Sequence, residues 1–325
     1  MEFIVCDENR MELWPFPDDC AMDFDLGDEN DVQVTCTRGQ MKQGYWIICP
    51  GTEYCALMEE DETNTNSEEE TWNGNAVRKL LQQYIIQPPS GQDYRTVSGE
   101  ANTILKSVLG NAFGGLFTFP EESSEIEISS YQFDRYTDAL TGFTKMLATK
   151  NARINIEVIQ GGANERFEIM LSAAPIQDLS EEIEYSQDSK VNVNIKESYR
   201  GINHLICLGQ GELKDRQVVH LYAQLDGSIS EKQYYTGLQE RTAVYDNNNA
   251  ENLNELIEGG TEKLQEEMNY KEMNLTVQDM DLQIGDIVSG RNYDNGLSLQ
   301  KPITRKIVKI ENGKIDIEYK TEGEE

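Results

Sequence analysis

The closing stretch of the chain, residues 276–319, constrains the fold most, because it has the alternation of two paired antiparallel strands. It ends in ITRKIVKI, then ENGK, then IDIEY. An Asn-Gly turn between two alternating runs is the strongest short-range signal for a β-hairpin. Residues 282–288 (LQIGDIV) predict an earlier strand with a glycine kink. Because about three strands with one buried face are needed for an independent sheet, we expect a small antiparallel unit that forms part of a barrel.

The chain is strongly acidic. Its 325 residues include 28 Lys and Arg against 59 Asp and Glu, so that the formal charge is -31. Binding to nucleic-acid phosphates depends on clustered basic side chains, and Thr304–Lys306 is the one short basic cluster. The composition therefore disfavours nucleic-acid binding, and the ordinary effect of such a charge is solubility. The length exceeds what one compact core organises, which predicts two or three domains.

The N-terminus has neither the basic region nor the apolar run of a signal peptide. The longest uncharged apolar stretch, residues 112–119, is too short to span a bilayer, so we expect a cytosolic product without membrane insertion. Six cysteines match no zinc spacing and form no C-x-x-C pair. Buried thiols are the expected outcome, with no metal bound by them.

Residues 1–60 have the pattern of β structure. Alternating or continuous apolar runs predict strands at 2–6, 11–14, 31–36 and 45–49. The run EEDETNTNSEEE at 59–70 contains no hydrophobic side chain. We expect it to be a solvated loop outside the sheet.

The middle of the chain predicts helices followed by a hairpin. Residues 71–84 carry an apolar stripe and end before PPSG, through which a helix does not continue. Further stripes predict helices at 99–109 and 134–149. Alternating strands at 153–159 and 166–172 flank a GGAN turn, so that residues 90–175 predict an α+β module.

Strand patterns resume at 191–195, 203–209 and 217–224. Residues 249–268 carry a helical stripe, with Asn247–Asn249 as candidate N-caps. Gly259 and Gly260 interrupt this stripe, and each costs about 1 kcal/mol in a helix interior. Two short helical pieces or a bend are therefore expected.

No pattern of an enzyme is present. The two histidines, His204 and His220, lie in predicted strands, where a structural or surface role is the ordinary one. The sequence contains no nucleophile elbow, phosphate-binding loop or zinc-protease motif. The glutamates at 121–127 could imitate a glycosidase pair, but acidic pairs arise by chance in so acidic a chain. We therefore predict no catalytic residue and no cofactor.

Two segments offer weaker patterns of a binding site. Residues 23–29 (DFDLGDE) resemble part of a calcium loop but lack its bidentate glutamate, and a turn-rich acidic loop is the simpler interpretation. The aromatic residues Trp14, Phe16, Tyr45 and Trp46 could form a sugar platform, but they are more typical of core or interface anchors. Whether a loop binds calcium or a glycan stays open at the level of the sequence.

Four blocks, in this order, resemble a group of siphovirus and prophage tail proteins related to the baseplate hub of phage tails. The first is WIICPGTEY at 46–54, where the family has GTEYGG and this chain has Cys55 and Ala56 in place of the glycine pair. The second is TWNG at 71–74 followed by LL and IIQPP, with Asn73 where arginine is usual. The third is YQFDRYTDAL at 131–140. The fourth comprises GDIV at 285–288, ITRKI at 303–307 and IEY at 317–319.

The resemblance implies an α+β, mainly β fold with two small, tube-like β-barrel domains and an α+β module between them. The first barrel would comprise residues 1–87, with the acidic loop 59–70 and the helix 71–84. The module would comprise 88–175. The second barrel would comprise 176–325, with the helical insertion 249–268. Three copies of such a chain would present six barrels and join a sixfold tail tube to a threefold tip.

The same resemblance implies a virion-tail location for a protein made in the host bacterial cytoplasm. Its partners would be two further copies, the tail tube or distal tail protein, the tape-measure protein and tip or fibre proteins. An acidic lumen would let DNA pass without specific binding. A receptor- or carbohydrate-binding tail module and a tail-associated cell-wall hydrolase are the alternatives. Candidate interface residues are Trp14, Trp46 and Arg305.

Overall fold

The computed structural model describes residues 1–162, 165–180, 191–197, 200–224, 227–250, 252–268, 271–277, 282–291 and 298–321. The chain divides into two compact units. The first combines Met1–Val193 with Asn274–Glu322, and the second is Asn194–Met273. The predicted turn residues Ala163 and Asn164 lie outside the described part of the chain.

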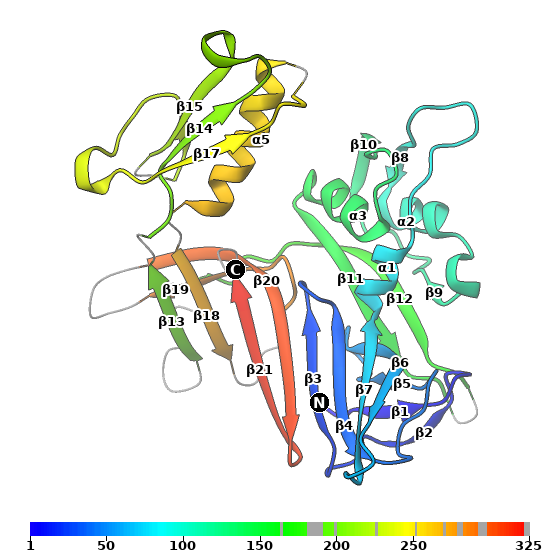
Figure 1. The fold of residues 1–325 in the computed structure, drawn as a ribbon. Helices are drawn as coiled ribbons and strands as arrows, with labels where there is room; N and C mark the ends of the chain where they lie inside the picture. Colours follow the sequence, from blue (N-terminus) through cyan, green and yellow to red (C-terminus); the bar gives the residue numbers. More distant parts are fainter. Residues whose placement is uncertain are drawn as a thin grey trace. The chain divides into compact units, whose positions relative to one another are not determined.

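The α+β, mainly β class predicted from the sequence is confirmed (Figure 1). Strands of the first unit are β1 (Ile4–Cys6), β2 (Glu12–Pro15), β3 (Ala21–Leu26), β4 (Asp31–Thr37), β5 (Trp46–Ile48), β6 (Cys55–Thr63), β7 (Glu69–Ala76), β8 (Thr96–Glu100), β9 (Phe117–Thr118), β10 (Glu127–Gln132), β11 (Ala152–Ile159), β12 (Glu168–Pro175), β19 (Ile287–Arg291), β20 (Ser298–Glu311) and β21 (Lys314–Thr321). The second unit contains β14 (His204–Leu208), β15 (Val218–Ala223), β16 (Ile229–Ser230) and β17 (Thr242–Asp246), while β13 (Val191–Glu197) and β18 (Lys271–Val277) have residues in both.

The described helices are short and carry the labels of Figure 1. They are α1 (Val77–Gln83), α2 (Ala101–Leu109), α3 (Ala139–Ala148) and α5 (Leu253–Glu267), with 3-10 turns at Ala112–Gly114, Leu213–Asp215 and Gly237–Gln239.

The closing hairpin predicted from alternation is confirmed. Strands β20 and β21 pair antiparallel, and Asn312 and Gly313 both have positive φ, at 52° and 71°. Two positive φ values suit the right-handed twist of a two-residue hairpin turn. The hairpin does not stand alone, because Lys306 to Ile310 of β20 pair with Leu26 to Met22 of β3.

The main sheet has the order β13-β18-β21-β20-β3-β4-β7-β6-β5-β1-β2, with β19 paired to β20, and curls into a half-barrel (Figure 1). Strands β1 and β5 of this sheet are buried on both faces. Ile4 and Ile48 pack into one hydrophobic cluster, and their neighbours Val5 and Ile47 pack into the other. This double burial explains why residues 45–49 form a continuous apolar run instead of an alternating one.

The structure corrects two predictions made for residues 59–84. Residues 69–76 form strand β7 and not the first half of the predicted helix. The helix begins only at Val77. Every second residue of β7 is buried, including Trp72, Gly74 and Ala76, and this period of two belongs to a strand. Residues 59–63, predicted to be part of a loop, continue β6 with exposed side chains. The acidic run is thus the solvent-facing end of a hairpin.

Strand β3 was missed by the sequence interpretation, which treated residues 23–29 as a turn-rich acidic loop. Met22 and Phe24 point into the core, while Asp23 is exposed between them. Residues 27–30 then form the tight turn to β4, in which the Asn30 side chain accepts a hydrogen bond from the Gly27 amide at 2.8 Å. The turn prediction was therefore correct for the second half of this segment only.

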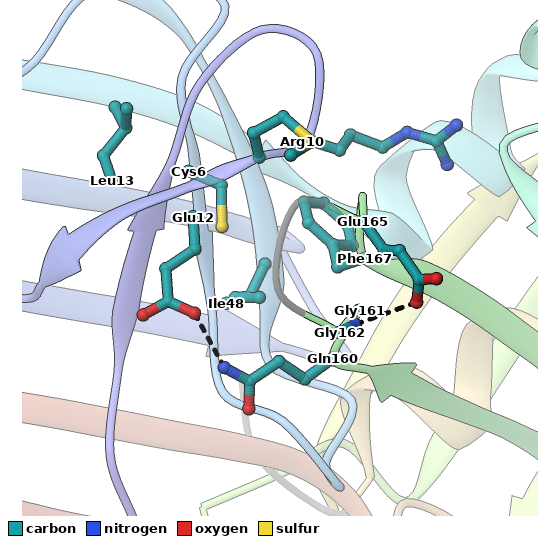
Figure 2. Close-up of a pocket in the computed structure, with 11 residues that line it drawn as sticks. Cys6, Arg10, Glu12, Leu13, Ile48, Gln160, Gly161, Gly162, Glu165 and Phe167 are labelled. Carbon is teal, nitrogen blue, oxygen red and sulfur yellow. Dashed lines mark hydrogen bonds between the residues drawn. The ribbon is translucent and has the colours of Figure 1, made fainter.

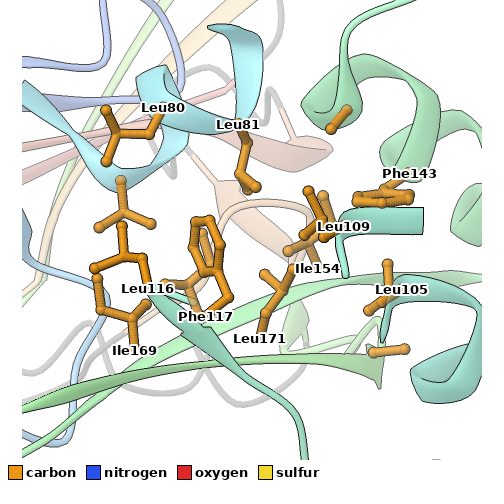
Figure 3. Close-up of a cluster of buried hydrophobic side chains, with 14 of the residues drawn as sticks. Leu80, Leu81, Leu105, Leu109, Leu116, Phe117, Phe143, Ile154, Ile169 and Leu171 are labelled. Atoms are coloured by element: carbon orange, nitrogen blue, oxygen red, sulfur yellow. The ribbon is translucent and has the colours of Figure 1, made fainter. Parts of the chain in front are cut away.

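Residues 99–175 contain the helices and strands predicted for the middle of the chain. Helices α2 and α3 begin at Glu100 and Asp138, whose side chains accept hydrogen bonds from first-turn amides. Strands β11 and β12 pair along their whole length, and β9 joins β12 in parallel. Figure 3 shows Leu81, Leu105 and Phe143 of the three helices meeting Ile154 and Leu171 of the two long strands.

In the second unit, a four-stranded sheet with the order β16-β15-β14-β17 has helix α5 against one face. The helix is continuous, which corrects the predicted break at Gly259 and Gly260. A Cβ on Gly260 would lie 2.4 Å from the Cys207 sulfur, so glycine permits the close approach of helix and sheet. The N-cap is Asn252 and not one of the three asparagines predicted from the sequence.

Candidate functional site

The two histidines meet on the second unit. His204 is buried, and its Nδ1 lies 2.8 Å from Glu240 Oε1 and 2.9 Å from Thr242 Oγ1. Its Nε2 lies 2.9 Å from Nδ1 of His220, and its ring stacks on Tyr222. Both ring nitrogens of His204 are thus engaged. The arrangement fits the structural role predicted for these residues, since it orders three strands through one imidazole.

A buried ionic cluster joins the two ends of the first unit. Glu53 Oε2 accepts a hydrogen bond from Arg78 Nε at 2.8 Å, and Lys306 Nζ lies 3.4 Å from Glu53 Oε1. Burial raises the pKa of Glu53, but the two cations outweigh it and hold the pKa below its ordinary value. Lys306 is fully buried and also lies over the Tyr54 ring, 4.8 Å from its centroid.

The sequence interpretation did not identify this cluster. Glu53 lies within the GTEY motif and Lys306 lies within the closing hairpin. The sequence indicates that both segments are important, but it does not predict that they contact each other. A lysine within the apolar pattern of a strand was the available signal, because buried lysines are almost always paired.

The acidic residues of β3 and of the turn that follows it face arginine and lysine side chains. Arg305, predicted as an interface residue, contacts Asp25 at 2.5 Å and Asp28 at 3.1 Å, and its side chain is 29% exposed. Lys309 Nζ lies 3.4 Å from Asp23. Within the described ranges, no group of three or more His, Cys, Asp or Glu side chains could hold a metal ion.

Trp46 and Trp14, the other two predicted interface residues, lie in different environments. Trp46 is 6% exposed, and its ring centroid lies 5.6 Å from that of Phe167. Trp14 is 37% exposed on the edge strand β2, where its ring packs edge-on against Tyr45. The structure therefore does not bring Trp14, Trp46 and Arg305 together on one patch, and their role in an interface stays a prediction.

A cavity of about 400 Å³ lies between strand β2 and the tip of the β11–β12 hairpin. Figure 2 shows Glu12 and Gln160 joined by a hydrogen bond of 2.8 Å, with Cys6 and Phe167 beside them. Burial, followed by the negative charges of Glu12 and Asp7, raises the pKa of Cys6 to about 12. A thiol in this state is a poor nucleophile.

Strand β2 ends the main sheet, and all four of its residues are exposed. Pro15 lacks an amide hydrogen, so the outer edge of β2 is a poor template for another strand. Contacts at this edge would therefore be made by the side chains of Leu13 and Trp14, both 37% exposed. In the part of the chain that the structure describes, no helix is long and apolar enough to cross a membrane.

No family model and no curated protein matches the sequence. Solved structures do match along the whole chain. The 43 kDa tail protein of prophage MuSo2 from Shewanella oneidensis aligns over 99% of this chain and 98% of its own, with a TM-score of 0.54 and 10% identity. The tail protein from Neisseria meningitidis MC58 aligns over 99% and 96%, with a TM-score of 0.51 and 11% identity. The chain therefore has the fold of phage and prophage tail proteins.

Proposed function

We propose that the chain is a structural subunit of a phage or phage-derived tail, and that three copies form the tail-tip or baseplate hub. One observation carries the proposal: two tail proteins align with this chain over at least 96% of their own length. The match thus includes both compact units and not a single common motif. Both aligned structures are tail proteins, which supports a structural role.

In this proposal the domains are those expected from the sequence. Residues 1–87 and 176–325 supply the barrels that continue the tube, and 88–175 lies outside them. The partners are the tail tube or distal tail protein, the tape-measure protein and tip or fibre proteins, in the virion tail. The net charge of -31 supports a channel that passes DNA without binding it, because a basic lumen would hold phosphates by releasing their counterions.

The carbohydrate-binding alternative depended on the tryptophan-rich N-terminal strands. Two of the three tryptophans, Trp46 and Trp72, are buried at 6% and 7% exposure. Only Trp14 remains accessible to a sugar ring, and a single half-exposed ring makes a poor platform. The observations therefore favour the structural role over a glycan-binding one.

Native mass spectrometry of the purified chain over a concentration series tests the hub. A trimer is the expected species, and a dimer would contradict the hub, since a twofold assembly cannot present six equivalent barrels to a sixfold tube. If the chain is monomeric at every concentration, its copy number in purified tail particles is measured instead. Three copies at the tip support the proposal, and absence of the chain from the particle refutes it.

Substitution of Trp14 sharpens this test. Exposed aromatic anchors dominate many interfaces, so Trp14→Ala should weaken the trimer about tenfold in dissociation constant. Leu238→Ala is the matched control, because Leu238 is fully exposed but belongs to the second unit and not to strand β2. Equal dissociation constants for both variants and the wild type would remove Trp14 from the interface while leaving the trimer itself in place.

A further inference from the structure

Two cysteines lie directly opposite each other on neighbouring strands of the first unit. The register of β3 and β4 pairs Ala21 with Thr35, so that the next positions outward are Cys20 and Cys36. Both side chains belong to the same hydrophobic cluster and are 1% exposed. Opposite residues of an antiparallel pair have Cα atoms about 4.5–5.5 Å apart, which is within the range that a disulfide requires.

The two thiols are in hydrogen-bond contact. The bond from Cys36 lowers the pKa of Cys20, against the effects of burial and of Asp19. The same contact raises the pKa of Cys36. Cys20 Sγ also lies 3.2 Å from Gln40 Oε1, and Cys36 Sγ lies 4.0 Å from Glu70 Oε1. Cys20 is therefore the better nucleophile of the pair, with an intact thiol immediately beside it.

The cysteines Cys6 and Cys55 provide an internal comparison. They are also buried in the same sheet, but they lie on β1 and β6, with β5 between these strands. Two strand spacings place them about 9–10 Å apart, beyond the reach of a disulfide without backbone movement. Cys207 is buried in the second unit.

We propose that Cys20 and Cys36 are a modification site, where a hydroperoxide-class oxidant converts the two thiols into an intrachain disulfide. The inference rests on the proposed function, in which the chain is made in a reducing cytoplasm and works outside the cell, where disulfides persist. A small oxidant is required, because the 1% exposure of both sulfurs excludes bulky disulfide reagents. The cross-link would clamp β4 to β3, the strand on which β20 docks.

The chemistry balances with hydrogen peroxide alone. The Cys20 thiolate attacks one peroxide oxygen, an S–O bond forms, the O–O bond breaks, and the departing hydroxide takes up a proton to become water. This step oxidises the Cys20 sulfur by two electrons. The Cys36 sulfur then attacks the Cys20 sulfur, an S–S bond forms and the S–O bond breaks. The leaving hydroxide takes the Cys36 proton, so that two thiols and one peroxide become one disulfide and two waters.

The test uses the full chain, purified under reductant and then exposed to an equimolar amount of hydrogen peroxide. After denaturation and alkylation, the number of titratable thiols should fall by two, and peptide mapping should recover a peptide that links Cys20 to Cys36. The midpoint of urea unfolding should rise on oxidation and return after reduction, because the cross-link restricts the unfolded chain.

Cys20→Ala should keep all of its remaining thiols, whereas Cys207→Ala should lose two as the wild type does. The wild-type thiol count is decisive even if Cys20→Ala folds poorly. Retention of all six thiols, a link between Cys6 and Cys55, or sulfinic acid at Cys20 without a link would each overturn the inference. A trimer or particle-bound chain without the cross-link would still support the tail role, so the two failures are distinguishable.

Discussion

The two compact units are built on different principles. In the first, segments about 280 positions apart in the sequence share one sheet, and the Glu53 carboxylate lies between the cations of Arg78 and Lys306. The second is one continuous segment in which helix α5 covers one face of four strands. The buried side chains of its hydrophobic core are Leu205, Cys207, Val219, Leu221, Ala250, Leu256 and Leu264.

The difference shows two ways of securing a sheet. The first unit joins distant strands by buried charges. Removal of one charge leaves its partner buried and uncompensated, so we expect it to lower the free energy of unfolding strongly. The second joins a helix to a sheet by close backbone approach, so that shape is critical at Gly260. Its other sheet face exposes Val218 and Val244 at 47% and 60%. A charge deletion in one unit and an added methyl group in the other test this contrast.

The largest effect is expected for Glu53→Gln. This change leaves two buried cations without their carboxylate and should lower the free energy of unfolding by about 3–5 kcal/mol. Denaturant unfolding, followed by hydrogen exchange in peptides of β20 and β3, would measure the loss and locate it in the first unit.

Asp23→Asn is the matched control for Glu53→Gln. It also removes a carboxylate that faces a lysine of β20, but the side chains of Asp23 and Lys309 are 51% and 55% exposed. Its effect should stay within about 1 kcal/mol. Similar losses for the two variants would show that burial of the charge is not what makes the Glu53 cluster important.

The second largest effect is expected for substitution of Gly260. Substitution of the adjacent Gly259 should change the free energy of unfolding in the opposite direction. In Gly260→Ala, the new methyl group meets Cys207 and Leu221, and the second unit should lose about 1–3 kcal/mol. In Gly259→Ala, the nearest atom is the terminal oxygen of Tyr245, which can move, so the helix preference of alanine should stabilise the unit by up to about 1 kcal/mol. Hydrogen exchange in β14 and β15 would report both changes, and the same sign for both would contradict the close approach at Gly260.

The smallest effect is expected at the start of α2. Glu100 accepts hydrogen bonds from the amides of Asn102 and Thr103 and from Ser124. Burial raises its pKa, but these hydrogen bonds lower it from 4.5 to about 2. Glu100→Gln should cost about 1 kcal/mol near neutral pH, as the loss of a helix cap does.

The pH dependence follows from the direction of this shift. Since the pKa is depressed in the folded state, the contribution of Glu100 is complete above pH 4.5 and is lost as the pH falls towards about 2. The difference between wild type and Glu100→Gln in urea midpoint should therefore shrink across this range. Glu121→Gln, an exposed neighbour, is the control, and a constant difference down to pH 2 would exclude the capping carboxylate as its source.

The sequence by itself determined the local elements whose patterns are complete within a few residues. The closing hairpin, the long strands β11 and β12 and the helices α2 and α3 belong to this group, because alternation, turn residues and helical stripes act over short distances. It also indicated the tail-protein fold through motif order. No comparable local signal existed for β7, whose buried side includes the small residues Gly74 and Ala76.

Only the tertiary structure decided which distant segments meet. It placed β20 beside β3, Lys306 beside Glu53, and Trp46 inside the core instead of on the surface. It also decided that Gly259 and Gly260 lie within one continuous helix and do not break it. The physical reason is that these outcomes depend on what lies across the core. A buried charge or a glycine is tolerated or favoured according to its neighbours there, and the spacing of residues along the chain does not record those neighbours.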